Sequence, residues 1–403
     1  MDDKIEFVRD LLRASHRNAL PDSATAPTAF LDATIAHAEL TRIGLRLLRE
    51  GKIAVLMVAG GISTRMGNNC LRGNLPIGPV TGRSIFRLQG EKIAAIKKRY
   101  ASRMLWLVMT SAAVHGETVR SFQREGYYGV SPEDVWFFQH ASLPVLDANL
   151  NPIHLADGTY LQSPAGHGGM LDALGKSGLL NRLRQRGVEY LFYFQYPNVL
   201  ERVCDPVMLG YHHVGGFEVT TKAFRGYRPD EKVGRVVAVG GSLRVVEYHP
   251  IQNAEANSWW HTVPANSGTH VWSVSFLERC LKEGIQLPYY SVYHRLSGDT
   301  ELPLRKVEQF VFDLLPHART SGLVVVSRAE EYAPIKLTSG DDSVEFARLA
   351  LLRLYRNWLD RAGAIPKGVD CRIEVSPFYA LDADDVFTKL PRGFCYQDGL
   401  VLK

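Results

Sequence analysis

Short apolar runs alternate with segments of helical periodicity over the first half of the chain, and this alternation constrains the fold more than any other feature. The first run, at 53–59, is bounded by Lys52 and by a glycine-rich stretch. Further runs of the same kind follow at 104–109, 135–138 and 190–194. Helical spacing of apolar residues fills the intervals at 85–100, 116–125 and 169–186. Strands that alternate with helices in this way predict an α/β fold with a doubly wound mixed sheet of Rossmann-like type.

The segments on either side of this alternation predict an N-terminal helical part and a small C-terminal domain. Apolar residues recur at helical spacing within residues 1–50. The main domain is expected at 51–340, and within it two alternating runs around Gly240 and Gly241 predict a β-hairpin. A helix from 343 to 362 precedes a tail with short β-like runs, so residues 341–403 are expected to form a helix plus a small domain that contains β-structure.

Composition excludes several classes of protein. The 403 residues are 46% hydrophobic and 22% charged, which excludes a disordered chain, a collagen and a small disulfide scaffold. Lys and Arg outnumber Asp and Glu by 47 to 42 without forming a basic block, which suits an anionic small ligand and gives no reason to expect nucleic acid. The five cysteines are scattered, and the sequence shows neither a signal-like core nor an apolar stretch of membrane length. We therefore expect a soluble cytoplasmic protein with no membrane partner.

A glycine-rich loop follows the first expected strand. It contains Gly60 and Gly61, then Thr64 and Arg65, and Arg72 stands shortly after them. Glycines let the backbone approach an anion closely, and backbone amides together with arginines can surround phosphate oxygens. The spacing fits neither the P-loop signature nor the dinucleotide fingerprint, and a turn from strand to helix needs glycine in any case. The loop alone therefore leaves open whether it binds phosphates or only makes the turn.

The longer run that contains this loop resembles the signature of the UDP-sugar pyrophosphorylases, and most closely that of the UDP-N-acetylhexosamine pyrophosphorylases. From Val58 to Ile93 it reads VAGGISTRMGNNCLRGNLPIGPVTGRSIFRLQGEKI. Further blocks resemble the same family in the same order: MTS at 109–111, FFQH at 137–140, SPAGHGG at 163–169, CDPVMLGYHH at 204–213, PDEKVG at 229–234, VVEY at 245–248, VEQFVFD at 307–313 and RAEEYAPIK at 328–336. The resemblance covers about residues 50–362. It implies a nucleotidyltransferase that forms a UDP-sugar and pyrophosphate from UTP and a sugar 1-phosphate.

The resemblance also implies roles for individual residues, position by position. The nucleotide and its base would be bound by Gly60, Gly61, Thr64, Gln139 and Gly166. Charge at the reacting phosphates would be neutralised by Arg65, Arg72 and Lys336. The sugar would be contacted by His167, Glu247 and Asn266. Such chemistry depends on positioning and charge neutralisation more than on a nucleophilic side chain.

The chain departs from the family pattern inside the implied site. Arg72 replaces a lysine and keeps the positive charge as a planar guanidinium. His167 replaces an asparagine, and because that amide both donates and accepts, we expect altered sugar recognition. Pro197 replaces the aspartate that holds magnesium in the family, and proline cannot ligate a metal. We expect Mg²⁺ to be held largely by the substrate phosphates, with Asp172 or Glu201 as candidate substitutes for the aspartate.

Two functions stay open from the sequence. An active nucleotidyltransferase with an altered sugar or metal requirement is favoured because Gln139, Glu247 and Lys336 are retained beside the loop. A catalytically silent member that binds a nucleotide or nucleotide sugar, as a sensor or partner subunit, is motivated by Pro197. A Rossmann-type oxidoreductase is disfavoured because the glycine spacing is wrong and no acidic ribose ligand follows at the usual distance. The sugar, the base and the oligomeric state are not predicted.

Overall fold

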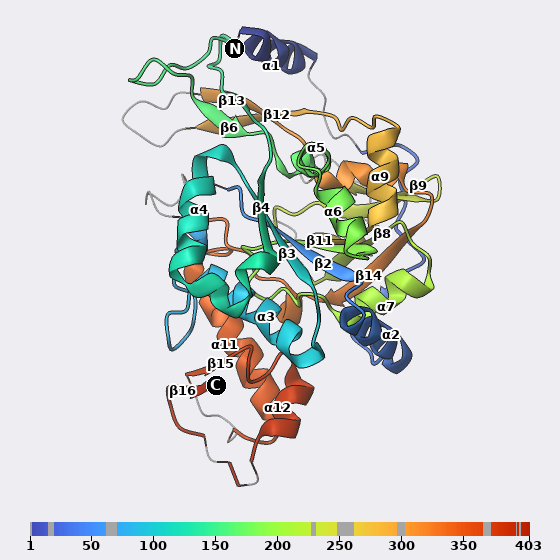
Figure 1. Cartoon of the computed structure of the whole chain (residues 1–403), viewed down its shortest axis with the longest axis vertical. Helices are drawn as coiled ribbons and strands as arrows, with labels where there is room; N and C mark the ends of the chain where they lie inside the picture. Colours follow the sequence, from blue (N-terminus) through green and yellow to red (C-terminus); the bar gives the residue numbers. More distant parts are fainter. Residues whose placement is uncertain are drawn as a thin grey trace.

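A ten-stranded sheet forms the centre of the computed structural model, which describes residues 2–14, 20–61, 71–226, 231–247, 262–295, 303–365, 372–391, 393–394 and 396–403. The strands follow the order β1-β14-β8-β11-β7-β2-β3-β4, with β9 paired to β11 and β10 paired to β9 (Figure 1). Their bounds are β1 Leu31–Asp32, β2 Ile53–Val58, β3 Leu105–Thr110, β4 Val135–Gln139, β7 Tyr190–Gln195, β8 Val219–Arg225, β9 Arg235–Val239, β10 Ser242–Val246, β11 Ala265–Ser273 and β14 Ser321–Ser327.

The sheet is mixed, as the sequence predicts. β2 runs parallel to β3 and β7, β3 runs parallel to β4, and β14 runs parallel to β1 and β8. β11 runs antiparallel to both β7 and β8, and β9 and β10 form the predicted antiparallel hairpin. The predicted α/β class with a doubly wound mixed sheet is therefore confirmed.

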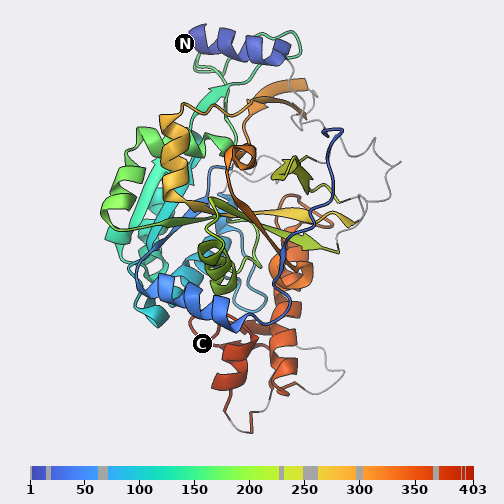
Figure 2. The same ribbon diagram turned by 90° about the vertical axis from the view of Figure 1, so that its right-hand side faces the viewer.

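Helices cover both faces of the sheet, which explains why the run at 53–59 is apolar throughout. One face is covered by α2 Ala38–Arg49, α3 Ile85–Tyr100, α4 Ala112–Arg124, α7 Pro206–Val214 and α11 Val344–Arg361. The other is covered by α5 Met170–Lys176, α6 Leu179–Gln185, α9 Val274–Lys282 and the 3-10 helix η7 Val311–His317. Figure 2 shows α9 and α11 on opposite sides of the sheet. Val55 and Met57 pack in the first layer and Ala54 and Leu56 in the second, because successive strand side chains point to opposite faces.

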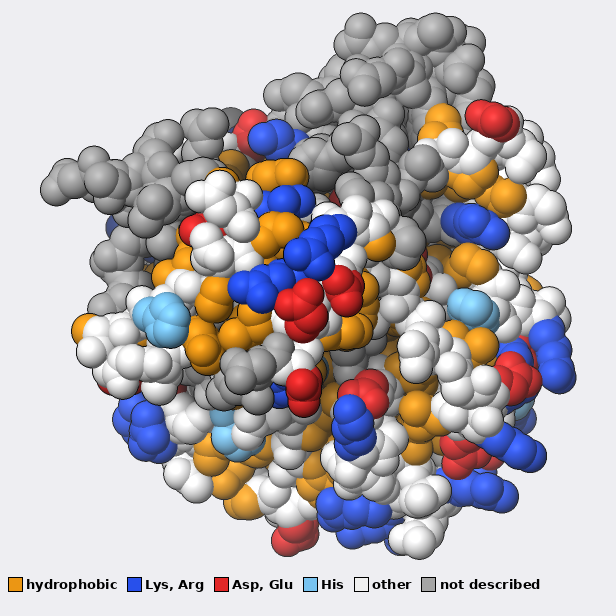
Figure 3. Space-filling model, turned by 90° about the horizontal axis from the view of Figure 1, so that it is seen from above, with side chains coloured by type: hydrophobic (Ala, Val, Ile, Leu, Met, Phe, Trp, Pro, Cys, Tyr) orange, Lys and Arg blue, Asp and Glu red, His pale blue; other side chains and the backbone are white. Residues whose placement is uncertain are grey.

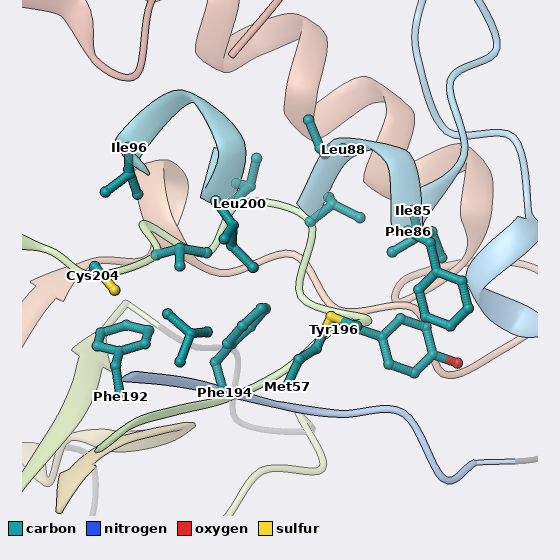
Figure 4. Close-up of a cluster of buried hydrophobic side chains, with 14 of the residues drawn as sticks. Met57, Ile85, Phe86, Leu88, Ile96, Phe192, Phe194, Tyr196, Leu200 and Cys204 are labelled. Carbon is teal, nitrogen blue, oxygen red and sulfur yellow. The ribbon is translucent and has the colours of Figure 1, made fainter. Parts of the chain in front are cut away.

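The first of these layers is dense where β2, α3 and β7 meet. Met57 lies beneath Phe86 of α3, and Phe192 and Phe194 of β7 lie beside it (Figure 4). The ring of Tyr196 lies 5.0 Å from that of Phe86, centroid to centroid. This packing fixes the segment that follows β7 against the helix that follows the glycine-rich loop.

Two helical predictions need correction. The periodic stretch 169–186 forms two helices, α5 and α6, because Gly178 between them takes a φ of +67°. Residues 1–50 contain α1 Asp2–Ala14 and α2, but β1 lies between these helices and pairs with β14. The segment is therefore only partly helical. By contrast, α3 has the predicted bounds, with the Ser84 hydroxyl accepting a hydrogen bond from the Arg87 amide at 3.2 Å.

A smaller unit lies at one end of the molecule, away from the sheet. Here α1 packs on the ribbons β12 Tyr290–Arg295 with β13 Pro303–Glu308, and β5 Ser142–Pro144 with β6 Gln162–Pro164 (Figure 1). Seen from this end, the described surface mixes acidic, basic and apolar side chains (Figure 3). Among the described residues, no helix is both long and apolar enough to cross a membrane.

The C-terminal part packs against the main sheet through α11 and a buried carboxylate. After α11, β15 Ile373–Val375 pairs in parallel with β16 Leu400–Leu402, and α12 Ala383–Lys389 lies between them in sequence. Glu374 of β15 accepts hydrogen bonds from the amides of Val80 and Thr81 at 3.0 and 2.8 Å. The predicted short β-like runs of the tail are thus a two-stranded ribbon tied to residues near the glycine-rich loop.

Candidate functional site

Loops from the parallel strands meet at the carboxyl ends of β2, β3, β4 and β7, where open α/β sheets place their ligands. β2 leads to Gly60, β3 to Ser111, β4 to His140 and β7 to Pro197. The Ser111 hydroxyl donates to the carbonyl of Gly60 at 2.8 Å, and the His140 amide donates to the carbonyl of Thr110 at 3.0 Å. The sheet therefore brings the predicted glycine-rich loop and the end of β4 together.

The backbone at Gly60, where the loop begins, has no room for a side chain. A Cβ atom at Gly60 would lie 2.6 Å from Nε2 of His140, whereas one at Gly61 would meet none of the described residues within 4 Å. The backbone is thus packed on one side and open on the other, as close approach of a ligand requires. Thr64 and Arg65, which the sequence assigns to the same loop, lie outside the described residues.

Arg72 reaches the segment that follows β7. It lies in the 3-10 turn η2 Arg72–Asn74 and acts electrostatically on Tyr196, one residue before Pro197. Burial raises the pKa of Tyr196 to about 12, and the charge of Arg72 opposes this rise. The predicted cation therefore acts on the residue that precedes, in sequence, the position where the family resemblance expects a metal-binding aspartate.

Lys336 reaches the same segment from the other end of the chain. The Ile335 amide donates to the carbonyl of Pro197 at 3.1 Å, so the strand-like segment that carries Lys336 runs beside the turn after β7. The Lys336 Nζ lies 3.2 Å from the Tyr332 hydroxyl and 3.3 Å from a carboxylate oxygen of Asp342. Burial opposes the charge of Lys336, but these two neighbours raise its pKa above the usual value. The backbone next to Lys336 thus binds the Pro197 turn, while the Lys336 ammonium is held by Tyr332 and Asp342.

The turn that carries Gly166 is built for glycine. Gly166 has a φ of +85°, and a Cβ atom there would lie 2.3 Å from the carbonyl oxygen of Gln309. The amide of Gly168 donates to that same oxygen at 2.9 Å. Gln139 lies at the exposed end of β4, next to His140, whose pKa burial lowers to about 4. The Ala165 amide donates to the carbonyl of Ala141 at 3.0 Å, so the segment of Gly166 lies beside the one that follows Gln139.

His167 is a neutral imidazole with a fixed orientation. Its ring lies 5.5 Å from the ring of Phe310 and 5.8 Å from that of Phe312, centroid to centroid. Nδ1 accepts a hydrogen bond from the Val311 amide at 3.1 Å. Burial, with a smaller contribution from His140, lowers the pKa of His167 to about 4. Because an amide donates to Nδ1, the neutral ring carries its proton on Nε2, which can only donate.

Glu247 and Asn266, the other predicted sugar contacts, meet at Gly234. The backbone amide of Asn266 donates to the carbonyl of Gly234 at 2.8 Å. A Cβ atom at Gly234 would lie 3.4 Å from Oε1 of Glu247. Asn266 stands at a bulge of β11, and its Oδ1 accepts from the amide of Gly268 at 3.1 Å. A Cβ atom at Gly268 would lie 3.4 Å from Nε2 of Gln195. The candidate sugar residues therefore lie next to the end of β7.

Tyr290 and Asp313 belong to this region and were not predicted. The Tyr290 hydroxyl donates to Oδ1 of Asp313 at 3.2 Å, and the Tyr290 ring stacks on Phe310 at 5.1 Å. Burial raises the pKa of Asp313 to about 7, and the charge of Glu247 adds to the rise. Asp313 lies in the VEQFVFD block, so a signal existed for it, whereas no motif points to Tyr290.

A buried cluster of ion pairs follows the Pro197 turn. It includes Glu201, one of the two candidate metal ligands. Glu201 accepts from Lys222 Nζ at 2.7 Å through Oε1, and from the Thr269 hydroxyl at 2.6 Å through Oε2. The Asn198 amide group also donates to Oε2 at 3.1 Å. Lys222 contacts a second carboxylate, that of Glu331, at 2.6 Å. Both oxygens of Glu201 are therefore already used by protein donors.

The residues around Pro197 do not fit a carboxylate-held magnesium ion. Asp172, the second candidate substitute, pairs with Lys176 at 2.7 Å on the exposed side of α5. Asp172 and Glu201 both already have protein partners, and a substitute for the aspartate stays a prediction. In the described ranges, no group of three or more His, Cys, Asp and Glu side chains could hold a metal ion.

The chain is similar to several known proteins along most of its length. The family described as UTP–glucose-1-phosphate uridylyltransferase matches residues 18–360. UDP-N-acetylglucosamine diphosphorylase 2 of Arabidopsis thaliana is 33% identical over 350 residues, which cover 80% of this chain and 69% of the relative. UDP-N-acetylglucosamine pyrophosphorylase of Saccharomyces cerevisiae is 31% identical over 353 residues, covering 82% and 74%. The crystal structure of the uridine diphosphate N-acetylglucosamine pyrophosphorylase of Trypanosoma brucei in complex with an inhibitor matches with a TM-score of 0.81 at 25% identity, covering 97% of this chain and 86% of that one.

Proposed function

Because the chain belongs to the UTP–glucose-1-phosphate uridylyltransferase family, we propose that it transfers the uridylyl group of UTP to a sugar 1-phosphate. The favoured sugar is an N-acetylated hexosamine, since two of its relatives are named for UDP-N-acetylglucosamine. The observation that carries the proposal is the position of the glycine loop, packed at Gly60 and open at Gly61, at the carboxyl ends of the strands, where Arg72 acts on Tyr196 and the segment of Lys336 binds the Pro197 turn.

In the proposed reaction, a phosphate oxygen of the sugar 1-phosphate attacks the α-phosphorus of UTP. The bond between the α-phosphorus and the oxygen that leads to the β-phosphate breaks, and pyrophosphate leaves. The transition state carries spread negative charge, which positioned cations and backbone amides stabilise. Arg72 and Lys336 would supply the charge, and Gly60 and Gly61 the close backbone. No nucleophilic side chain is required.

Magnesium is expected to enter this site on the phosphates of the nucleotide. Pro197 offers no ligand, and Glu201 is engaged by Lys222 and Thr269. Magnesium commonly keeps several waters and is bound through substrate phosphates with few protein carboxylates. We therefore propose that this chain binds the ion more weakly than a relative with aspartate at this place.

The sugar side of the proposed site differs from that of relatives with an amide at position 167. His167 presents an N–H donor through Nε2 and no acceptor, because Nδ1 is engaged by the Val311 amide. Glu247 accepts hydrogen bonds, and Asn266 has an amide group on the same side of the site. A sugar oxygen that must accept is thus favoured near His167, and a hydroxyl or amide that must donate is disfavoured.

A silent binding protein is the second candidate function, and Pro197 is the observation that favours it. A chain without the metal-binding carboxylate could keep the nucleotide and sugar contacts and lose turnover. In that case it would bind a nucleotide sugar tightly and act as a sensor or as a subunit of a larger assembly.

Pyrophosphate release separates the two functions. UTP, CTP, ATP and GTP would each be combined with glucose 1-phosphate, N-acetylglucosamine 1-phosphate or N-acetylgalactosamine 1-phosphate, with and without magnesium. Lys336→Met should lower turnover about 100- to 1,000-fold, while the exposed control Lys98→Met should not change it. No pyrophosphate from any pair, together with tight binding of a UDP-sugar in calorimetry, would reject the enzyme and support the silent binder.

A further inference from the structure

The turn 337–342, between Lys336 and α11, brings Asp342 back to Lys336. The carbonyl of Asp342 accepts hydrogen bonds from the backbone amides of Lys336 and Leu337 at 2.7 and 3.0 Å. Ser343 follows as the N-cap of α11, a helix that packs on the main sheet. The helix therefore anchors the turn, and the turn anchors the backbone of the lysine that the proposed function assigns to the reacting phosphates.

The carboxylate of Asp342 has the Lys336 ammonium as its partner. Oδ2 lies 3.3 Å from Nζ of Lys336. Oδ1 is buried and has no hydrogen-bond partner in the part of the chain that the structure describes. An aspartate that only shapes a turn accepts from a backbone amide close by in sequence, as Asp32, Asp147 and Asp157 do. The side-chain contact of Asp342 therefore serves the lysine and not the turn.

The backbone of Asp342 takes a conformation that favours glycine. Its φ is +62°, in the left-handed region that few residues with a side chain adopt, although Asp and Asn are among the better tolerated. Gly340, two residues earlier, has a φ of +71° without steric cost. A carboxylate thus stands where the turn itself would favour glycine, and such strain is found where a side chain has a function.

Lys336 is held on one side and open on another. Its side chain is 38% exposed, whereas that of Asp342 is 14% exposed. The Nζ atom also lies 3.2 Å from the Tyr332 hydroxyl. The Tyr332 ring has a second cation, Arg328, at 5.9 Å, and that guanidinium pairs with Glu231 at 2.8 Å. Within the described ranges, Asp342 is therefore the one carboxylate in contact with the Lys336 ammonium.

We propose that Asp342 is a positioning residue, which holds the Lys336 ammonium where the phosphates of the nucleotide bind. The inference rests on the proposed function, which makes Lys336 a cation at the reacting phosphates. An ammonium has three N–H donors, enough for Asp342, Tyr332 and a phosphate oxygen. Burial opposes the charge of Lys336, and Tyr332 and Asp342 offset this by raising its pKa. Asp342 itself acts through the lysine and not on the substrate.

Steady-state kinetics of Asp342→Asn tests the positioning. Asparagine has the same shape and tolerates the left-handed backbone, so the change removes the charge and keeps the turn. We expect kcat to fall about 10-fold and KM for UTP to change less than about threefold, because the cation acts mainly on charge in the transition state. Glu345→Gln is the control, since it removes an exposed carboxylate that pairs with Arg348 at 2.9 Å. A kcat for Asp342→Asn equal to that of the control would overturn the proposal.

A double-variant cycle tests whether Asp342 acts through Lys336. In the Lys336→Met background, Asp342→Asn should lower kcat by less than about twofold further, because the two side chains act as one unit. A favourable charge at the N-terminus of α11 would instead be lost with or without the lysine. An undiminished loss of about 10-fold in the double variant would therefore refute the positioning role.

Acetylation of Lys336 by acetic anhydride, measured by mass spectrometry across pH, gives a readout that needs no turnover. In Asp342→Asn the acetylation should rise at a pH about 1–3 lower than in the wild type, because the ion pair favours the protonated amine. UTP should protect Lys336 in the wild type. An unchanged pH dependence in the variant, or no protection by UTP, would contradict the proposal. Absence of pyrophosphate from every substrate pair would reject the proposed function alone, since acetylation would still decide whether Asp342 holds the lysine at bound nucleotide.

Discussion

Lys222→Met should lower the free energy of unfolding by about 3–5 kcal/mol, because it leaves buried carboxylates without their cation. Lys222 is fully buried in β8, with Nζ 2.7 Å from Glu201 and 2.6 Å from Glu331. Methionine fills a similar volume, so the loss is electrostatic and does not reflect a cavity. In the variant, Glu201 still accepts the hydrogen bond from the Thr269 hydroxyl. The carboxylate of Glu331, by contrast, loses the hydrogen bond that Lys222 donates in the wild type. We expect Glu331 to account for most of the cost.

Urea unfolding, monitored by tryptophan fluorescence, measures this loss of unfolding free energy from the midpoint and slope of the transition. The control is Lys52→Met, which removes an ion pair of 2.6 Å to Glu189 whose side chains are 32% and 46% exposed. Exposed pairs of this kind contribute about 0–1 kcal/mol. The two variants therefore compare ion pairs of the same length that differ in burial.

The loss should also depend on pH. Burial already raises the pKa of Glu331, and Lys222 opposes that rise. Without the lysine the pKa rises further, so the folded variant holds a proton that the unfolded chain has released. The deficit should thus be smaller at about pH 5 than at about pH 8. A loss no larger than that of Lys52→Met, at both pH values, would refute the account that Lys222 stabilises the two buried carboxylates.

Four further substitutions test the site and its surroundings. Gly166→Ala should lower the urea midpoint more than Gly158→Ala, because both glycines have a positive φ but only a Cβ at Gly166 would meet a carbonyl, at 2.3 Å; equal losses would contradict the close contact. His167→Asn should raise kcat/KM for a common sugar 1-phosphate, and unchanged values for every sugar would show that His167 only shapes the turn. Pro197→Asp should reduce severalfold the magnesium concentration for half-maximal turnover, and an unchanged requirement would show that another group already holds the ion. Asp313→Asn should flatten the pH dependence of stability. The pKa of Asp313 is about 4 in the unfolded chain and about 7 in the folded protein, so the wild type should lose stability as the pH rises between these values. Constant stability of the wild type over that range would contradict the raised pKa.

The sequence predicted those elements whose burial produces a recognisable pattern of apolar residues within a short stretch of chain. A strand covered on both faces is apolar throughout, so the run at 53–59 predicted β2 to within one residue. The helical spacing of apolar residues at 85–100 predicted α3 from end to end. β1 was missed because two residues are too few to show periodicity. The antiparallel placement of β11 depends on its neighbours β7 and β8, which no local window contains.

The sequence pointed to candidate site residues where a motif contains them, and it pointed to none where only the fold brings residues together. The resemblance supplied Gly60, Arg72 and Lys336, which the structure places around one end of the sheet. The hydrogen bond from Tyr290 to Asp313 joins β12 to η7, and no spacing in the sequence links the two. The engagement of Glu201 by Lys222 equally depends on packing, so its availability for a metal could not be judged from its type.

Other expectations stay predictions. The domain boundaries at 50 and 340 follow from changes in pattern, and the cytoplasmic location follows from scattered cysteines. Cys204 and Cys280 are buried and free, while the remaining cysteines lie outside the described residues.

The pairing of β1 with β14 sets an order for folding during synthesis. Leu31 lies opposite Val324, and α1 packs on β13. The N-terminal elements β1 and α1 therefore cannot complete their packing until β13 and β14 have been synthesised. About 290 residues separate Leu31 from Val324, and ribosomes add roughly 5–20 residues per second, so this edge stays incomplete for roughly 15–60 s. Until β14 emerges, β8 presents an unpaired strand edge, which is a template for aggregation. A nascent chain stalled before residue 321 should therefore depend on chaperones that bind exposed strands, and one released after residue 327 should not.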